Sequence, residues 1–336
     1  YQKRCPFVID ELLEPARRSG HRFMIRLVKG AYWDSEIKRA QVDGLADYPV
    51  YTRKVHSDLS YLVCAARLLA APDAVYPQFA THNAHTLATV AEMARALGAE
   101  DYEFQCLHGM GEPLYDNVVV AGRPCRIYAP VGTHETLLPY LVRRLLENGA
   151  NSSFVNRLVD AAVSIDELVD DPLAQARRHA GRRHPAIQLP GELYGSARVN
   201  SQGLDLSDEL VIAQTTAGLA ALSTRAWQAG PLVAGSAPLA GGRAVINPAR
   251  HGDTVGTVID SDLPTLELAL ANAEQAAASW HAVPPATRAG MLLEAADRLE
   301  AKRPELMALC VREAGKTWSN AVAEVREAVD FCRYYA

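Results

Sequence analysis

Four apolar segments with strand character, each followed by a helical segment, constrain the fold of the first half of this chain more than any other feature. The strands are expected at residues 24–28, 75–80, 102–107 and 126–129, and the helices at 9–19, 34–42, 53–71, 85–97, 114–120 and 133–148. Strands separated by helices form βαβ units and a parallel sheet. Four strands make half of a (βα)₈ barrel, or most of a smaller doubly wound sheet.

The two alternatives place a functional site at the same edge of the sheet, the carboxyl ends of the strands. Polar and aromatic residues gather there in this chain, at residues 29–33, 81–83 and 107–109 and at Tyr128. No strand in this half is followed by the GxGxxG glycine pattern of dinucleotide-binding folds, which counts against the doubly wound alternative.

Residues 24–34, which read MIRLVKGAYWD, bring unusual chemistry to the end of the first strand. Two cations, a glycine and two aromatic residues follow one another where the strand gives way to a helix. Gly30 has no Cβ and lets the backbone approach a ligand closely. The segment is typical of a site for a flat, anionic ligand, although an ordinary βα turn with solvated charges has the same composition.

The helix expected at 133–148 carries a second candidate site. Tyr140, Arg143, Arg144 and Glu147 are spaced so that they share one helix face, while leucines and a valine supply the apolar face. Two adjacent guanidinium groups form a fork that suits a carboxylate. The alternative is a solvated arginine pair on a helix surface.

Composition excludes several classes of protein. A chain of 336 residues has room for two domains. Its net charge of −5 does not indicate binding to nucleic acid. It has no run of 18 apolar residues and no secretory signal. The six cysteines form no CxxC pair and no zinc pattern, so we expect no metal site and a reducing, cytoplasmic setting.

Four motifs in the first half occur in the order found in one family. They are RLVKGAYWD at 26–34, FATHN at 79–83, EFQCLHGMGEPLY at 103–115 and YLVRRLLENGAN at 140–151. Together they resemble the proline dehydrogenase domain of bacterial proline utilization A, over residues 1 to about 165. The resemblance implies a (βα)₈ barrel that holds FAD, oxidises L-proline to Δ¹-pyrroline-5-carboxylate and passes electrons to a membrane quinone.

The resemblance also implies roles for individual residues. The cofactor-binding residues would be Arg26, Val28, Lys29, Gly30, Ala31, Tyr32, Trp33, Thr52, His82, Asn83, Gln105 and Glu147. The proline ring would be enclosed by Tyr32, Leu107, Tyr128 and Tyr140, and its carboxylate would pair with Arg143 and Arg144. Of these, Tyr32, Tyr128, Tyr140, Arg143 and Arg144 would be the catalytic set.

Residues 166–195 have a different character and are expected to form a helical linker. Acidic residues precede the basic run at 177–184, and prolines interrupt the pattern. A basic run can bind nucleic acid, but acidic neighbours and the lack of interleaved aromatic residues favour a solvated linker.

From residue 196 to 336 the pattern is a helix at 206–229, two short strands around residues 241–258, and helices at 263–280, 289–302 and 305–314. The motifs NP at 247–248, EAGK at 313–316 and EVREAVDF at 324–331 resemble the N-terminal part of the aldehyde dehydrogenase superfamily. In proline utilization A this domain is the NAD-dependent L-glutamate γ-semialdehyde dehydrogenase, and it follows the barrel.

Three features of this second half invite a catalytic interpretation that we reject. Gly315 and Lys316 lack the earlier glycine of a phosphate-binding loop. Cys310 and Cys332 lie in helical patterns outside the superfamily's catalytic-cysteine context. We expect the catalytic and NAD-binding residues of the second activity to lie beyond residue 336.

The sequence thus predicts an internal fragment of a bifunctional proline-catabolic enzyme: the C-terminal half of the barrel, a linker and the start of an aldehyde dehydrogenase domain. We expect the whole enzyme to be a cytoplasmic homo-oligomer that can associate peripherally with the inner membrane. Half a barrel leaves open sheet edges, so we expect the chain alone to bind FAD weakly. Alternatives are a non-redox module that binds small carboxylates, or an inactive scaffold.

Overall fold

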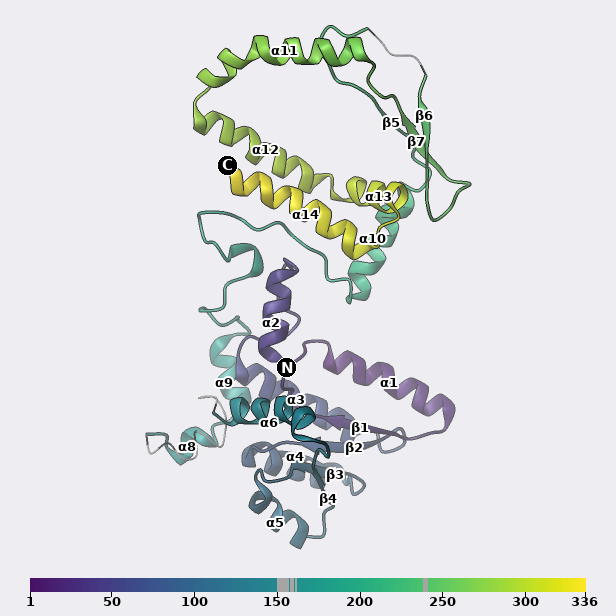
Figure 1. Cartoon of the computed structure of the whole chain (residues 1–336). Coiled ribbons are helices and arrows are strands. Elements are labelled where there is room, and N and C mark those ends of the chain that lie inside the picture. Colours follow the sequence, from purple (N-terminus) through teal and green to yellow (C-terminus); the bar gives the residue numbers. More distant parts are fainter. Residues whose placement is uncertain (150–156, 158–159, 161, 238–240) are drawn as a thin grey trace. The chain divides into compact units, whose positions relative to one another are not determined.

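The computed structural model describes residues 1–149, 157, 160, 162–237 and 241–336 (Figure 1). It separates into two compact units. The first contains residues 1–39 and 48–187, and the second contains residues 40–47 and 188–336. The predicted domain limits of 1–165, 166–195 and 196–336 differ from these units mainly in the linker, most of which groups with the first unit.

The first unit alternates helices and strands as the sequence predicts. Its elements are α1 (Cys5–Ser19), β1 (Phe23–Leu27), α2 (Trp33–Val42, whose last residues group with the second unit), α3 (Lys54–Leu69), β2 (Val75–Ala80), α4 (Ala84–Leu97), β3 (Glu103–Leu107), α5 (Glu112–Val120), β4 (Cys125–Tyr128), α6 (His134–Gly149), α8 (Ile165–Leu168) and α9 (Pro172–His179). Helix α1 starts four residues earlier than expected, because Pro6 is well tolerated in a first helical turn.

The sheet of the first unit decides between the two predicted folds. Its four strands are parallel and lie in the order β1-β2-β3-β4, so each strand pairs with its neighbour in the sequence. A doubly wound sheet reverses its strand order at a switch point, whereas a (βα)₈ barrel winds in one direction. The order therefore matches four consecutive strands of a barrel.

The two faces of this sheet differ in polarity. On one face the strands pack against helices α3 and α5 over an apolar core that includes Leu68, Val75, Phe79 and Phe104. The opposite face carries hydrogen-bonded polar side chains, Arg26 from β1 among them. In a closed barrel this second face would line the interior, so the half barrel presents its site face openly.

Local signals place the helix that follows β2. The Asn83 side chain accepts a hydrogen bond from the backbone N–H of Thr86 at 2.9 Å and caps α4. Gly98 ends the same helix with a φ of 64°, a conformation that glycine adopts without strain. Both ends of the helix therefore follow from residues next to it in the sequence, and its N-terminus lies at the carboxyl end of β2.

The second unit combines a small sheet with a group of helices. Its elements are the 3₁₀ turn Pro190–Glu192, α10 (Glu209–Ala221), β5 (Trp227–Ala229), β6 (Arg243–Ile246), β7 (Thr254–Val258), α11 (Leu263–Ala282), α12 (Pro285–Ala301), α13 (Arg303–Ala314) and α14 (Trp318–Tyr335). The sheet has the order β5-β7-β6, with β5 parallel and β6 antiparallel to β7. Helices α12, α13 and α14 share a core around Met307 and Val329.

One expected element of the second unit is wrong. The helix predicted at 206–229 ends at Ala221, and residues 227–229 form strand β5 instead. Trp227 pairs with Gly256 of β7, so a partner distant in the sequence overrides the helical propensity of the alanine-rich stretch.

Candidate functional site

The predicted carboxylate-binding residues come together at the carboxyl ends of the strands. Arg143 of α6 donates a hydrogen bond to the Tyr32 hydroxyl, and its Cζ lies 4.3 Å from the Tyr32 ring centroid. The Arg144 Cζ lies 5.1 Å from the Tyr140 ring centroid. The Tyr140 and Tyr128 rings lie 6.4 Å apart, centroid to centroid. Two guanidinium groups thus lie among three aromatic rings, from the loop before α2, from β4 and from α6.

His82, at the end of β2, connects this group to the sheet. Burial lowers the pKa of His82, and the positive charges of Arg144 and Arg26 lower it further. Its Nε2 accepts a hydrogen bond from the backbone N–H of Leu107 at 3.2 Å. The imidazole is therefore neutral near pH 7 and holds the end of β2 against the end of β3.

A polar ladder crosses the open face of the sheet. The Arg26 Nε donates to the Gln105 Oε1 at 2.8 Å, and the Gln105 Nε2 donates to the Glu103 Oε1 at 2.7 Å. The Glu103 carboxylate also accepts two hydrogen bonds from Arg126, at 2.8 and 2.9 Å. Because β1, β3 and β4 supply these groups, the ladder fixes the positions of Arg26 and Gln105 relative to each other across the sheet.

Glu103 supplies the carboxylate of this ladder. Its residue is 3% exposed, and hydrogen bonds from Arg126 lower its pKa from 4.5 to about 2. A carboxylate with a lowered folded pKa contributes stability above its unfolded pKa, and this contribution is lost as the pH falls through the folded pKa. We therefore expect the free energy of unfolding to fall between about pH 4.5 and pH 2 because of Glu103.

Glu103→Gln tests this expectation in urea unfolding followed by circular dichroism at several pH values. The variant should be less stable than the unmodified chain at pH 6, and the difference should shrink as the pH falls toward 2. Glu92→Gln is the matched control, because Glu92 pairs with Arg95 on the exposed surface of α4. A difference between the chain and Glu103→Gln that does not change with pH would contradict the role of the Glu103 charge.

Lys29, predicted to contact a cofactor, lies in a compact charged cluster. Its Nζ is 2.6 Å from the Asp58 Oδ1 and donates to the Thr86 Oγ1 at 3.0 Å. Lys54 approaches the other oxygen of Asp58, also at 2.6 Å. Burial lowers the pKa of Lys29, and Asp58 opposes that change. One carboxylate thus neutralises part of the charge of two lysines.

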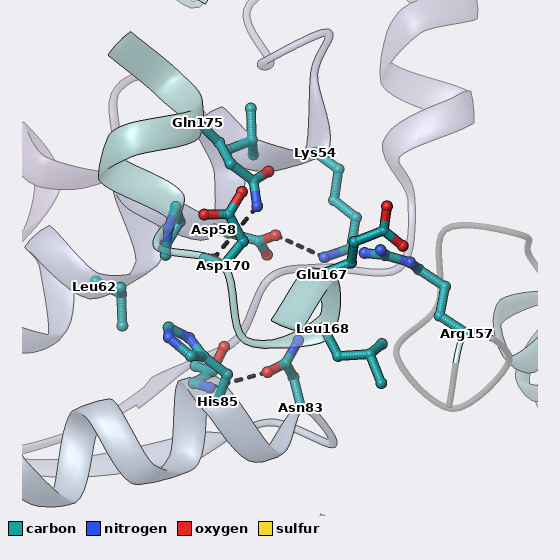
Figure 2. Close-up of a pocket in the computed structure, with 13 residues that line it drawn as sticks. Lys54, Asp58, Leu62, Asn83, His85, Arg157, Glu167, Leu168, Asp170 and Gln175 are labelled. Carbon is teal, nitrogen blue, oxygen red and sulfur yellow. Dashed lines mark hydrogen bonds and ion pairs between the residues drawn. The ribbon is translucent and has the colours of Figure 1, made fainter. Parts of the chain in front are cut away.

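A polar cavity of about 180 Å³ opens beside this cluster. Figure 2 shows the residues that line it. Lys54 and Val55 reach it from the first turn of α3, and Asn83 and Thr86 reach it from the start of α4. The N-termini of two helices therefore face it, an arrangement that attracts anions.

The other side of the cavity is lined by the segment around α8 and α9. Glu167 and Asp170 bring negative charge to it, and Arg157 brings a cation. The lining thus carries two cations, Lys54 and Arg157, and three carboxylates, one of which, Asp58, is also paired with Lys29. The two helix N-termini are therefore the feature of the cavity that would favour an anion.

The remaining predicted residues occupy structural positions near the site. Gly30 has a φ of 100°, which a glycine adopts readily, and it turns the chain from β1 toward α2. The Trp33 Nε1 donates to the backbone carbonyl of Tyr51 at 2.7 Å. The Thr52 Oγ1 accepts from the backbone N–H of His184 at 2.9 Å. Val28 is exposed and Ala31 half-buried.

The side chain of Glu147, which the sequence predicts to bind the cofactor, lies outside the part of the chain that the structure describes.

Leu107 is half-buried at the end of β3 and pairs in register with Tyr128. It lies beside Tyr128 at the strand ends, and its role at the site stays a prediction.

Sequence reasoning missed Asp58, Lys54 and Thr86 around Lys29, and Glu103 and Arg126 in the ladder. Strand alternation could have indicated the ladder, because Glu103 and Gln105 are two residues apart and point to the same face. No local signal indicates that Asp58, in the middle of a helical pattern, meets Lys29. Among the described residues, no group of three or more His, Cys, Asp or Glu is arranged to hold a metal ion.

Comparison with known proteins accounts for both halves of the chain. Residues 1–157 match the family model described as proline dehydrogenase, and residues 239–336 match the aldehyde dehydrogenase family. The bifunctional protein PutA of Klebsiella aerogenes is 58% identical over 351 aligned residues that cover 100% of this chain. The chain is therefore similar to PutA proteins along its whole length. It spans about a quarter of the length of the curated PutA relatives that it matches, 27% for the Klebsiella protein.

Solved PutA structures resemble this chain in fold. A crystal structure of a variant of Bradyrhizobium japonicum PutA matches 100% of this chain and 31% of its own, with a TM-score of 0.79 and 42% identity. The 1-pyrroline-5-carboxylate dehydrogenase of Bacillus pumilus is 41% identical over 91 residues, which cover 27% of this chain and 18% of that protein. The PutA relatives thus share both halves of the chain, and the Bacillus protein shares a segment of 91 residues.

Proposed function

We propose that this chain supplies the FAD- and proline-binding face of a PutA enzyme that oxidises L-proline to Δ¹-pyrroline-5-carboxylate. The observation that carries the proposal is the placement of Arg143 and Arg144 among Tyr32, Tyr128 and Tyr140 at the strand ends. A fixed pair of guanidinium groups holds a carboxylate with defined geometry, and the tyrosine rings shield an apolar ring from water.

The residues beside this group fit a flavin cofactor. Arg26, held by Gln105, lies on the open sheet face next to the site. The cavity between the starts of α3 and α4 suits the phosphate groups of FAD, with Lys54 on its wall and Lys29 bonded to two residues that line it. Bound FAD supplies the hydride acceptor for proline oxidation.

The chain's own residues have the tasks of orientation and exclusion of water. The arginines fix the carboxylate, which turns the proline ring toward the cofactor, and the aromatic side chains keep the site dry. Neutral His82 adds no charge that would compete for the carboxylate. Hydride transfer from proline bound as the free amine needs no general base with an unusual pKa.

The second unit would begin the L-glutamate γ-semialdehyde dehydrogenase domain, which uses NAD. We place the catalytic and NAD-binding residues of that activity beyond residue 336. The whole enzyme would convert proline to glutamate in two oxidations, with glutamate semialdehyde as the second substrate. The alternatives of a non-redox carboxylate-binding module and an inactive scaffold are not favoured by the family matches.

We also propose an electron acceptor and a cellular location for the whole enzyme. A membrane quinone would accept electrons from the flavin, and the enzyme would be a cytoplasmic homo-oligomer with peripheral access to the inner membrane. None of the helices in the described parts of the chain combines the length and apolar character needed to span a bilayer.

Flavin binding tests this proposal in the full-length enzyme that carries this segment. The purified enzyme should contain FAD whose visible absorbance bleaches when proline is added under anaerobic conditions. Lys29→Met should weaken FAD binding by about tenfold or more, because it removes a buried cation from the cluster beside the proposed phosphate site. Lys38→Met, on the exposed surface of α2, is the matched control.

Ligand binding to the isolated chain and to the full-length enzyme distinguishes the flavoenzyme from the non-redox module and the scaffold. Calorimetric binding of proline in the absence of flavin would favour the non-redox module. A folded full-length enzyme that binds neither FAD nor proline would overturn the proposal and favour the scaffold. Weak FAD binding by the chain alone, with tight binding by the full-length enzyme, is the expected result, because half of a barrel supplies only part of the site.

A further inference from the structure

The first unit contains a second cavity that is distinct from the polar one. Its volume is about 560 Å³, which lies in the range typical of sites for small molecules. Helices α3 and α9 supply most of its walls, and the two cavities share no lining residue. Along these helices, residues that line one cavity alternate with residues that line the other. The two cavities therefore lie on different faces of the helix pair.

Apolar side chains make up much of the wall of this second cavity. Leu59 and Val63 line it from α3, and Leu173 and Ala176 line it from α9, in each case about one helical turn apart. Val63 and Leu173 remain exposed to solvent. A ligand with an apolar body would cover these side chains, and the removal of their surface from water favours binding.

His56 adds a buried polar group to this lining. The residue is 9% exposed, and its buried Nε2 has no hydrogen-bond partner in the part of the chain that the structure describes. The ring packs edge to face against those of Tyr51 and His179, with centroids 6.1 and 6.4 Å away. Burial of a polar atom without a partner is unfavourable, so a ligand that hydrogen-bonds to Nε2 relieves part of that free energy.

The charge of the lining is positive. Arg177 of α9 is exposed and carries a full charge, and no Asp or Glu is among the described residues that line the cavity. Burial lowers the pKa of His56, and the charges of His179 and Arg53 lower it further, so the His56 ring is neutral near pH 7. The polar cavity differs, because three carboxylates line it. An anion is therefore the charged group that complements the second cavity.

We propose that the second cavity binds a small amphiphilic carboxylate, of which a medium-chain fatty acid is the simplest example. The apolar chain of the ligand lies against Leu59, Val63 and Leu173. Its carboxylate pairs with Arg177 and accepts a hydrogen bond from the Nε2–H of neutral His56. Binding is reversible and changes no covalent bond. None of the residues predicted to bind FAD or proline lines this cavity, so the site does not depend on the proposed flavin chemistry.

Isothermal titration calorimetry of the full-length enzyme tests the proposal, with octanoate as the probe and octanol as its uncharged counterpart. We expect octanoate to bind at a single site in each chain, and octanol, which lacks the carboxylate, to bind more weakly by about tenfold or more. Absence of octanoate binding, or equal affinity for the two probes, would overturn the proposal. Octanoate binding by the isolated chain but not by the full-length enzyme would show that another segment of the enzyme fills the cavity, and would overturn it as well.

Two variants of α9 test the ionic contact. Arg177→Met removes the charge and keeps a long side chain, so the affinity for octanoate should fall about tenfold while the affinity for octanol stays the same. Arg178→Met is the matched control, because Arg178 is the next residue of the helix, pairs with Asp170 and does not line the cavity. Its octanoate affinity should be unchanged. Equal losses in the two variants would show that octanoate responds only to the general positive charge of α9, and would contradict the role of Arg177.

Two further variants test the cavity itself. Val63→Trp places a large side chain at an exposed position of the wall, so the chain should fold and octanoate binding should be lost. His56→Phe keeps a ring and removes Nε2, and should weaken octanoate binding by roughly fivefold. Circular dichroism establishes that each variant is folded before it is compared. Unchanged octanoate binding in folded Val63→Trp would place the ligand elsewhere and overturn the proposal, whatever the behaviour of the variant at the buried position 56.

Discussion

Replacing Arg144 with alanine in the full-length enzyme is expected to weaken proline binding by about 1–3 kcal/mol or more, the loss that follows removal of a charged hydrogen bond. Arg144 lies on α6 with its guanidinium group against the Tyr140 ring. Its positive charge lowers the pKa of His82. Without it the proline carboxylate would pair with one guanidinium group, that of Arg143, instead of two. Steady-state kinetics should show a rise in KM for proline of roughly 5- to 150-fold.

Three companion variants make the result specific to the fork. Arg144→Lys keeps a positive charge without the planar, two-pronged donor, so its KM should lie between those of the unmodified enzyme and Arg144→Ala. Arg143→Ala should weaken binding and also release Tyr32, which Arg143 contacts. Arg95→Ala removes an exposed arginine of α4 that pairs with Glu92, and should leave KM unchanged. An unchanged KM in Arg144→Ala would contradict the assignment of this residue.

Replacing Arg312 with alanine is expected to cause the largest loss of stability in the second unit. Arg312 is 8% exposed, and its guanidinium group donates to both oxygens of Asp253, at 2.6 and 3.1 Å. It also donates to the backbone carbonyl of Arg225 at 2.7 Å. These contacts join α13 to the turn before β7 and to the segment before β5. We expect the melting temperature of this unit to fall by roughly 5–10 °C.

Differential scanning calorimetry of the chain measures this change. The matched control is Arg298→Ala, because Arg298 is an exposed residue of α12 that pairs with Glu294 one turn away. Surface pairs of this kind contribute little, so the control should melt within about 1–2 °C of the unmodified chain. Equal melting temperatures for the two variants would show that the Arg312 contacts do not hold the second unit together.

Much of the first unit was predictable because its signals are local. Strand residues 75–80 lie between turn-forming residues, and the predicted and observed bounds of β2 agree. The site edge was predictable for the same reason, since parallel strands place their carboxyl ends together and the motif residues follow those ends directly. The arginine and tyrosine spacing on α6 likewise defines one helix face without any tertiary information.

The second unit shows where local signals are insufficient. Residues 206–229 are rich in alanine and leucine and read as one helix, yet Trp227 and its neighbours form a strand. Their hydrogen-bond partners are in β7, about thirty residues later in the chain. Whether such a segment becomes helix or strand depends on a partner that no short window of sequence contains.

The sequence by itself determined the order of the two modules and the residues at each strand end, because short motifs and periodic patterns carry that information. The tertiary structure decided which groups meet. It brought Asp58 to Lys29 and Asp253 to Arg312, across 29 and 59 positions of sequence. Such contacts depend on how helices and strands pack, and packing is a property of the folded chain rather than of any local pattern.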